Sequence, residues 1–235
     1  MKLQISFDLT DLDRALEIAG QIHEYADILE IGTLLVYAHG TTAVERFREA
    51  FPDKVLLTDT KIVDRGKESI ALFANAQTDW VTVMAGTNKN VIHAACTAAH
   101  ERNKKVVLDM IDSKEIGQSA LEAKNLGADA LLVHQPYDVE EPLEFLDKWE
   151  MIRGNTDLPI FISTRIGRDN IEDILNVKPD GITLGRTITE AENPREEAKF
   201  FYNKCKGIEP EPEASGEEAT ESAEVSEEES GSEEE

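Results

Sequence analysis

Eight short apolar runs, each followed by a stretch with helical spacing, constrain the fold of this chain more than any other feature of its sequence. The runs are rich in Val, Ile and Leu, and they lie at residues 3–7, 28–31, 55–57, 80–84, 105–108, 130–133, 160–162 and 181–184. Strands that are apolar almost throughout are typical of a parallel sheet that is covered on both faces. Eight strand–helix units within residues 1–207 therefore predict an α/β fold of the (β/α)8 TIM barrel type, near the lower limit of its size.

A doubly wound open sheet is the alternative architecture. Such a sheet usually places a glycine-rich phosphate loop after an early strand. The first strand here ends in Phe7-Asp8-Leu9-Thr10, which contains no glycine, and this favours the barrel.

Helix signals stand between the apolar runs. The first helix has apolar residues at the i, i+3, i+4, i+7 spacing, namely Leu12, Ala15, Leu16, Ala19 and Ile22. We expect Thr10 to cap this helix, with Asp13 as its partner three residues later. The last helix is predicted to begin at Asn193, because Pro194 and Glu196 follow it in positions typical of a helix start.

The acidic residues are unevenly distributed. Of the 48 Asp and Glu residues, 13 lie at 208–235, where the chain has no Lys or Arg. Residues 1–207 therefore contain 35 acidic and 24 basic residues. We therefore predict a barrel domain over residues 1–207 and a disordered Glu-rich tail over residues 208–235. The tail would act as a solubilising segment or contact an unknown partner. Neither part offers the basic patches that nucleic acid requires, so no nucleic-acid partner is expected.

The sequence shows no sign of a membrane segment or a disulfide framework. No apolar run approaches the length of a membrane span, and the chain opens on a strand pattern without a secretory signal. The two cysteines, Cys96 and Cys205, stand singly inside helical patterns, which indicates neither a metal motif nor a convincing disulfide. We expect a cytoplasmic protein with no membrane partner.

The third apolar run leads into the charged segment Asp59-Thr60-Lys61-Ile62-Val63-Asp64. Residues two apart face the same side of a strand, so Asp59 and Lys61 should project together. Charges at the mouth of a buried strand are costly to desolvate unless they are paired. Three charges at one strand end indicate a functional site in which charged side chains take part.

Polar side chains follow the other strands as well, and the active site of a barrel lies at this end of its strands. In chain order they are Asp8, Glu30, Asp59 with Lys61 and Asp64, Thr87, Asp109, His134, Ser163 to Arg165, and Gly185-Arg186. Each has an ordinary structural explanation by itself, such as capping of the next helix by Asp8. Together they predict one site rich in ionisable groups.

The residue types suggest a division of roles within that site. Glu30 and Asp59 on neighbouring strands could share one Mg²⁺ ion, which would act as a Lewis acid. Lys61 supplies a fixed positive charge for a developing oxyanion. His134 titrates in the range needed for proton transfer. Gly185-Arg186 follows the last strand, where barrels often hold a phosphate group.

These segments resemble the orotidine-monophosphate-decarboxylase superfamily over residues 1–205, and within it the chain is most similar to the 3-hexulose-6-phosphate synthases. The D-x-K-x-x-D pattern of residues 59–64 is the superfamily's hallmark. Further similarity lies in residues 30–33, 107–111, 133–138 and 185–189. Orotidine-monophosphate decarboxylases usually carry Lys at the position of Glu30. Ketogulonate-phosphate decarboxylases usually carry Glu at the position of Asp109 and Arg at the position of Tyr137.

The resemblance implies a lyase that condenses formaldehyde with ribulose 5-phosphate in a reversible aldol reaction, as in the formaldehyde-assimilating ribulose monophosphate pathway of carbohydrate metabolism. It implies Mg²⁺ as cofactor and a homodimer as the assembly. In the implied site, Glu30 and Asp59 bind the metal, Lys61 stabilises developing negative charge, and His134 transfers a proton. Asp8 and Asp109 would orient substrate hydroxyls, and Asp64 would extend into the active site of the partner subunit. The remaining implied substrate contacts are Thr87, Arg165, Gly185 and Arg186.

Two segments depart from the family pattern. Ser163-Thr164-Arg165-Ile166 stands where the family has Gly-Gly-Ile, and Pro136 stands where it has Gly. Arg165 could offer a charged fork in place of backbone amides, or it could fill the phosphate pocket. Two other functions therefore stay open: a 3-keto-L-gulonate-6-phosphate decarboxylase, and a non-catalytic barrel that binds a sugar phosphate or serves as an assembly partner.

Overall fold

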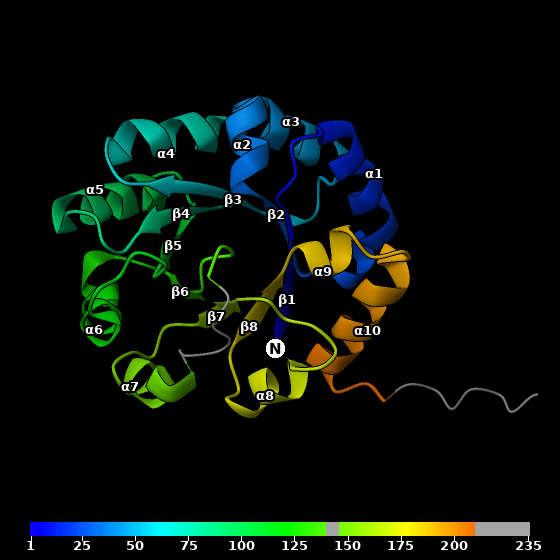
Figure 1. Cartoon of the computed structure of the whole chain (residues 1–235). Helices are drawn as coiled ribbons and strands as arrows, with labels where there is room; N and C mark the ends of the chain where they lie inside the picture. The colour runs from blue at the N-terminus through cyan, green and yellow to red at the C-terminus, as the bar shows by residue number, and fades with distance from the viewer. Residues whose placement is uncertain (140–145, 210–235) are drawn as a thin grey trace, which may run out of the picture.

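A closed barrel of eight parallel strands forms the centre of the protein (Figure 1). The computed structural model describes residues 1–139 and 146–209. Each strand pairs with the next one along the chain, and β8 pairs with β1. The strands are β1 Lys2–Phe7, β2 Ile28–Ile31, β3 Val55–Ile62, β4 Trp80–Met84, β5 Lys105–Asp109, β6 Ala130–His134, β7 Ile160–Ser163 and β8 Gly181–Leu184. The prediction of a (β/α)8 barrel is confirmed.

Helices surround the barrel on its outer side (Figure 1). The α-helices are α1 Leu12–Ile22, α2 Thr33–His39, α3 Thr41–Ala50, α4 Gly66–Asn75, α5 Lys89–His100, α6 Ile116–Leu126, α7 Trp149–Gly154, α8 Ile171–Asn176, α9 Arg186–Thr189 and α10 Pro194–Lys206. Two short 3₁₀ helices, η1 His23–Tyr25 and η2 Leu146–Lys148, join them. Among the described residues, no helix combines the length and apolar character that a membrane span requires.

The ends of the first and last helices follow from their capping residues. Thr10 is not the cap of α1: the carboxylate of the next residue, Asp11, accepts from the Arg14 N–H at 3.0 Å. Asp11 has the extended backbone of a capping residue, and its side chain reaches the third helical N–H. The prediction for α10 is confirmed, since the Asn193 side chain accepts from the Glu196 N–H at 3.2 Å.

Beyond α10, the structure describes the chain as far as residue 209. Gly207 ends the helix in a left-handed conformation with φ 66°, which glycine adopts without steric cost. The predicted domain boundary after residue 207 stays a prediction. The predicted disordered tail lies, from residue 210 onward, outside the described residues. Cys96 and Cys205 are both free and buried in their helices.

The third strand is longer than its apolar run suggested. We expected it to end at Leu57, but β3 continues to Ile62, so that Asp59 and Lys61 lie within the strand. Near the mouth of a barrel, an inward side chain meets other polar side chains rather than packed apolar groups, so an apolar residue is not required there. The pairing of β3 with β4 also shifts register between Thr58 and Ile62.

The barrel interior is divided into an apolar half and a polar half. One cluster of inward side chains closes the apolar half, and its members are Ile28, Leu57, Trp80, Val107, Ala130, Leu132 and Phe161. Burial of each large apolar side chain contributes about 1.5–3 kcal/mol. Trp80 meets Phe161 edge-on at 6.1 Å, and Gly181 leaves the room that the Phe161 ring needs, because an added Cβ would collide with that ring.

A second, larger core lies between the strands and the helices and includes Phe7, Leu35 and Phe47. Because successive residues of a strand face opposite sides, this core takes the alternate residues of each strand. Both cores hold the strand ends in fixed positions. Polar side chains can therefore be buried at the carboxyl ends of the strands, where they form the candidate site.

Candidate active site

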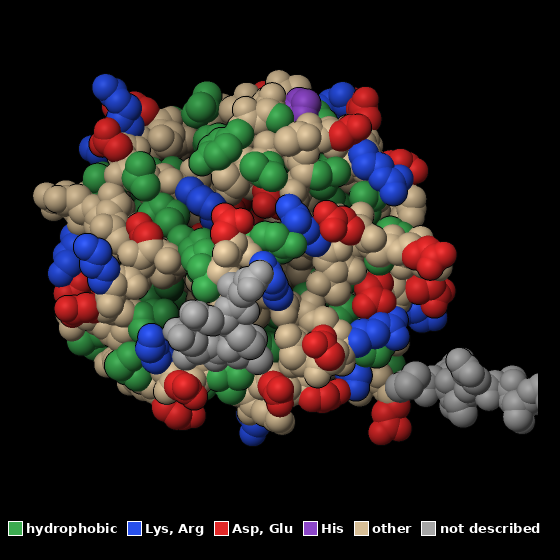
Figure 2. Space-filling model, in the orientation of Figure 1, with side chains coloured by type: hydrophobic (Ala, Val, Ile, Leu, Met, Phe, Trp, Pro, Cys, Tyr) green, Lys and Arg blue, Asp and Glu red, His purple; other side chains and the backbone are tan. Residues whose placement is uncertain are grey.

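Five ionisable side chains meet inside the polar half of the barrel. Glu30 comes from β2, Asp59 and Lys61 from β3, Asp109 from β5 and His134 from β6. Glu30, Asp59 and Asp109 are buried. On the face shown in Figure 2, acidic and basic side chains lie side by side near the middle of the molecule, with hydrophobic side chains around them. The sequence predicted all five residues for the site, and the fold brings them together.

Lys61 joins two of the carboxylates. Its Nζ lies 2.9 Å from Asp59 Oδ2 and 3.1 Å from Asp109 Oδ2. Burial opposes the charged ammonium, but the two carboxylates outweigh it and raise the pKa of Lys61 well above its ordinary value. Lys61 is therefore a permanent cation at neutral pH, and it fixes the two acids relative to each other.

The backbone at Lys61 is strained. Its φ of 45° lies in the left-handed region, which costs a non-glycine residue on the order of 1–3 kcal/mol. The Thr82 hydroxyl on β4 holds this conformation: Oγ1 accepts from the Lys61 N–H at 2.9 Å and donates to Asp59 Oδ1 at 2.7 Å. One neutral side chain thus positions both members of the β3 charge pair.

Asp59 is held from three directions. Besides Thr82 and Lys61, the Thr33 hydroxyl at the start of α2 donates to Asp59 Oδ2 at 2.5 Å. Thr33 and Thr82 were not predicted from the sequence to belong to the site. The available signal was position: Thr82 is an inward polar residue in the otherwise apolar strand Trp80–Met84.

Asp109 and His134 form the second pair of the site. His134 Nδ1 lies 3.0 Å from Asp109 Oδ2 and 3.2 Å from Oδ1, and the Ile111 N–H donates to Oδ1 at 3.0 Å. A carboxylate only accepts, so Nδ1 carries a proton and Nε2 is left for proton transfer. The Asp109 side chain is 0% exposed, whereas that of His134 is 19% exposed.

The two groups shift each other's titration. Burial works against the charged form of each. Hydrogen bonding and attraction between them outweigh it, so the pKa of His134 is raised above its usual value and the pKa of Asp109 is lowered. Lys61 adds to the lowering at Asp109 and opposes the raising at His134. The imidazole therefore keeps its second proton to a higher pH than a free histidine does.

Glu30 is the least compensated acid of the group. Gln4 Nε2 donates to Glu30 Oε2 at 2.5 Å. Burial, followed by repulsion from Asp59, nevertheless raises the pKa of Glu30 to about 7, against the opposing effects of Gln4 and Lys61. A buried carboxylate next to a second carboxylate favours a bound cation.

The donor set of this corner suits a hard divalent ion. Glu30 and Asp59 offer carboxylate oxygens, and the described residues contain no group of three or more His, Cys, Asp or Glu side chains placed to hold a metal. Mg²⁺ is commonly bound through one or two carboxylates and takes its other ligands from water and substrate. Zn²⁺ sites usually have three or four protein ligands, which this corner does not offer.

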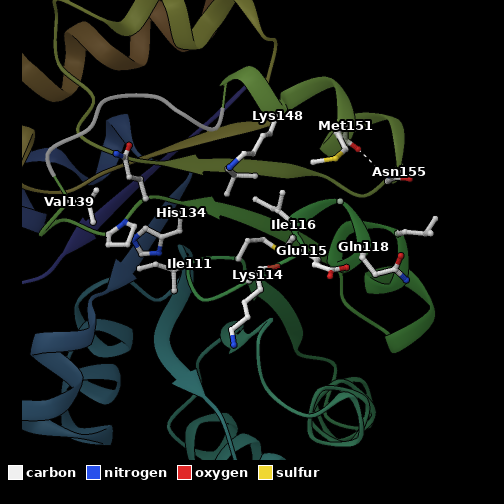
Figure 3. A pocket seen from close by; sticks show the side chains of 17 residues that line it. Ile111, Lys114, Glu115, Ile116, Gln118, His134, Val139, Lys148, Met151 and Asn155 are labelled. Carbon is white, nitrogen blue, oxygen red and sulfur yellow. Dashed lines mark hydrogen bonds between the residues drawn. The ribbon is translucent and has the colours of Figure 1, made fainter.

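A cavity of about 680 Å³ opens beside the charged group, between α6, α7 and the connections that follow β5 and β6. Figure 3 shows His134 at one end of the cavity and Met151 and Asn155 at the other. Ile111, Ile116 and Val139 also line it. His134 therefore belongs both to the buried charge network and to a space that a small molecule can enter.

Other predicted site residues make different contacts. Asp8 Oδ1 accepts from the Leu34 N–H at 2.8 Å, at the start of α2, so Asp8 caps a helix other than the one it precedes. The Thr87 hydroxyl donates to the Val63 carbonyl at 2.6 Å and joins the connections after β4 and β3. Asp64 is exposed in the connection after β3. The fold does not bring these three into the buried group.

The predicted phosphate residues lie at the ends of β7 and β8. Arg165 and Arg186 both place their guanidinium groups over the ring of Tyr137, at 4.7 and 4.2 Å from its centroid. Gly185 directly precedes α9, and a Cβ there would meet only the Ser6 carbonyl at 3.8 Å. Arg165 and Arg186 thus form a basic group around one aromatic ring. Their arrangement around Tyr137 was not expected from the sequence.

Comparison with known proteins places this geometry in a family. The model of the orotidine 5′-phosphate decarboxylase / HUMPS family matches residues 1–201. A 3-hexulose-6-phosphate synthase of Bacillus subtilis is 33% identical over 200 residues, which cover 84% of this chain and 95% of that protein.

Solved structures show the same relationship. The 3-hexulose-6-phosphate synthase of Salmonella typhimurium superimposes with a TM-score of 0.83 at 29% identity, covering 89% of this chain and 100% of the other. A 3-keto-L-gulonate-6-phosphate decarboxylase of Vibrio cholerae gives 0.76 at 26% identity, with 89% and 99% covered. Both enzymes therefore share the fold of this chain.

Proposed function

The chain belongs to the orotidine 5′-phosphate decarboxylase / HUMPS family of enzymes, and we propose that it is a 3-hexulose-6-phosphate synthase, an aldolase that joins formaldehyde to D-ribulose 5-phosphate. The observation that carries the proposal is the network Asp59–Lys61–Asp109–His134, which combines a fixed cation with a histidine open to a cavity. Similarity to synthases over most of the chain supports the choice within the family.

The proposed reaction begins with proton transfer at the substrate carbon next to the carbonyl. His134 Nε2 takes a proton from C1 of ribulose 5-phosphate, and the electron pair of the broken C–H bond forms an enediolate. Asp109 holds the imidazole by Nδ1 and stabilises the imidazolium that results. The Lys61 ammonium stands where the negative oxygen develops, which lowers the barrier electrostatically.

Carbon–carbon bond formation follows. The electron pair at C1 attacks the carbon of formaldehyde, the C=O bond opens, and its oxygen takes up a proton from the His134 imidazolium, which returns to the neutral imidazole. The atoms of both reactants appear in the product, a 3-hexulose 6-phosphate, so no oxidant or reductant is needed. The same groups serve the reverse cleavage, because each proton transfer runs in both directions.

We propose that Glu30 and Asp59 hold Mg²⁺ during this reaction. The raised pKa of Glu30 marks a corner with surplus negative charge, and its oxygen donors match the preference of this ion. When bound, the ion would supply Lewis-acid stabilisation of negative substrate oxygens.

A homodimer is also proposed, with Asp64 serving the site of the partner subunit. Support comes from exposed apolar side chains on Asp64's own connection and on two helices that contact β3: Val63 beside Asp64, Leu34 and Tyr37 on α2, and Leu72 on α4. Figure 2 shows hydrophobic side chains gathered over the part of the molecule where Figure 1 places α2 and α4. Exposed apolar patches of this kind commonly mark protein contacts.

Isotope exchange tests the reaction without requiring the second substrate. In D₂O with Mg²⁺, the protein should exchange a C1 proton of ribulose 5-phosphate for deuterium, and added formaldehyde should then give a hexulose phosphate. A His134→Gln variant should lose both signals. A folded protein that binds Mg²⁺ but exchanges no proton would refute the proposal.

Two other outcomes identify the alternatives. Release of CO₂ from 3-keto-L-gulonate 6-phosphate, without condensation, would assign the decarboxylase activity of the Vibrio cholerae relative. Thermal stabilisation by ribulose 5-phosphate without exchange or turnover would indicate a binding protein, because a ligand that binds only the native state raises Tm by mass action.

A further inference from the structure

Two lysine side chains meet at the bottom of the barrel, the end at which its strands begin. Lys2 is the first residue of β1 and Lys105 is the first residue of β5, and in a closed ring of eight strands β1 and β5 lie opposite each other. Both ammonium groups lie over the ring of Trp80, at 5.7 and 5.2 Å from its centroid. We refer to Lys2 and Lys105 as the bottom lysine pair.

The bottom lysine pair holds two like charges close together. Because each ammonium group lies within about 6 Å of the same ring centroid, the two are no more than about 12 Å apart. Both residues are exposed, and the attraction of an exposed cation to one aromatic ring is modest. Within residues 1–139 and 146–209, neither ammonium group pairs with an acidic side chain.

The aspartates at this end of the barrel are already engaged. One directly precedes every second strand, from β2 to β8, and its carboxylate accepts a backbone N–H of the strand before at 2.7–2.9 Å. Each also contacts a basic side chain of a surrounding helix at 2.5–3.0 Å. The four are Asp27, Asp79, Asp129 and Asp180, with Lys206, Arg48, His100 and Arg153 as their partners in that order. These four carboxylates therefore do not compensate the bottom lysine pair.

The Glu-rich tail leaves the barrel at the same end. Lys206 is the last residue of α10, and its Nζ donates to the Met1 carbonyl at 3.2 Å, so the end of this helix lies beside the residue that precedes Lys2. Residues 209–235 then contain 13 Glu and no Lys or Arg. An extended chain covers about 3.3–3.6 Å per residue. A few residues of the tail are therefore enough to reach across the bottom lysine pair.

We propose that the Glu-rich tail binds across the bottom of its own barrel, with Glu carboxylates on Lys2 and Lys105. The tail begins beside one of the two lysines and carries the charge that the pair lacks. A single exposed ion pair contributes little, but attachment to the same chain gives the carboxylates an effective concentration in the millimolar range. The contact lies at the opposite end of the barrel from the candidate active site, and it does not rest on the proposed reaction.

Carbodiimide cross-linking of the full-length protein tests the contact directly. The reagent joins a carboxylate to a lysine amine where the two touch, and mass spectrometry of the digested protein locates the bond. In low salt, tail peptides should be joined to Lys2 and Lys105 about tenfold more often than to Lys67, an exposed lysine at the start of α4 and thus at the other end of the barrel. In about 1 M salt, where the Debye length falls to about 3 Å, this preference should disappear.

A double-mutant cycle in the full-length chain provides the second measurement. In low salt, Lys2→Gln with Lys105→Gln should lower Tm by about 2–4 °C. The same pair of substitutions should leave Tm unchanged in a protein whose tail carries Glu211→Gln, Glu213→Gln, Glu217→Gln and Glu218→Gln, because the contact is then already lost. Lys67→Gln, the matched control, should change Tm equally with either tail.

Any of three results would overturn the proposal. The first is an even distribution of tail cross-links over exposed lysines, or a preference for Lys148 near the barrel mouth. The second is cross-linking between copies in a mixture of isotope-labelled and unlabelled protein, which would assign the tail to a neighbouring molecule. The third is an equal effect of the two lysine substitutions with and without the tail charges, which would mean that the bottom lysine pair acts independently of the tail.

Discussion

Replacement of Glu30 by Gln should stabilise the metal-free protein at neutral and higher pH while it abolishes activity. Glu30 is buried beside Asp59, and its pKa rises from 4.5 to about 7 on folding. The folded state therefore keeps a proton that the unfolded state has already released, and stability falls as pH rises from 4.5 through 7. Gln has the same shape and no charge, and its amide oxygen can still accept from Gln4.

The pKa shift sets the size of the effect. About 2.5 pKa units at 1.36 kcal/mol each give about 3 kcal/mol of destabilisation at pH 8. At pH 5 the destabilisation is only about 0.8 kcal/mol, because this pH lies just above 4.5, where the unfolded carboxyl begins to release its proton. For a domain of this size, about 3 kcal/mol corresponds to a rise in Tm of about 6–12 °C. The gain from Glu30→Gln should therefore be large at pH 8 and small at pH 5.

Urea denaturation in the presence of a chelator measures this difference. Wild type, Glu30→Gln and the exposed control Glu45→Gln would be unfolded at pH 5 and pH 8, and the control should match wild type at both. Added Mg²⁺ should then stabilise wild type more than Glu30→Gln. If Glu30→Gln is no more stable than wild type at pH 8, or if its advantage does not shrink at pH 5, the assignment of uncompensated charge to Glu30 is wrong.

Two further predictions concern the charged network and its support, and a third concerns the apolar core of the barrel. The kcat/KM of the enzyme should increase with pH, with a midpoint above 6.5, because the pKa of His134 is raised and the imidazole must lose its second proton before it acts as a base. Asp109→Asn should move this increase to lower pH and reduce kcat. pH–rate profiles and NMR titration of the imidazole would detect both effects. Thr82→Val removes the hydroxyl that holds Asp59 and the strained β3 backbone, so we expect a loss of about 1–3 kcal/mol in urea denaturation and lower kcat, whereas unchanged kcat would contradict its positioning role. Gly181→Ala would press a methyl group against an aromatic ring in the lower barrel core and should cost about 1–3 kcal/mol in unfolding free energy with kcat per folded molecule retained.

The fold could be predicted because its strands are buried on both faces. Near-continuous apolar runs such as 130–133 follow directly from that burial, and their count gives the barrel. The same signal failed at β3, because a residue that faces the polar half of the interior need not be apolar. Asp59 and Lys61 therefore read as the end of a strand, although they lie within it.

The charged site residues could be predicted, but their neutral supports could not. A buried charge demands a partner, so Glu30, Asp59 and Asp109 stand out in an apolar context. A threonine hydroxyl carries no such signal, and the bridging position of Thr82 depends on the register shift between β3 and β4. The arrangement of Arg165 and Arg186 around Tyr137 could not be predicted for a related reason, since it is assembled from three connections whose paths the strand pattern does not specify.

The charges of the buried network explain why one of its acids titrates near neutrality. Lys61 and protonated His134 supply two positive charges, while Glu30, Asp59 and Asp109 can supply three negative ones. Two acids are matched by direct contacts with the cations. The third negative charge would be that of Glu30, whose pKa burial and repulsion from Asp59 raise to about 7. A divalent cation at this corner would turn a surplus of one negative charge into one positive charge, which favours an oxyanion of the substrate. The uncompensated carboxylate of Glu30 thus explains two things: the lower folding stability of the metal-free protein at high pH, and the proposed need for Mg²⁺ in catalysis.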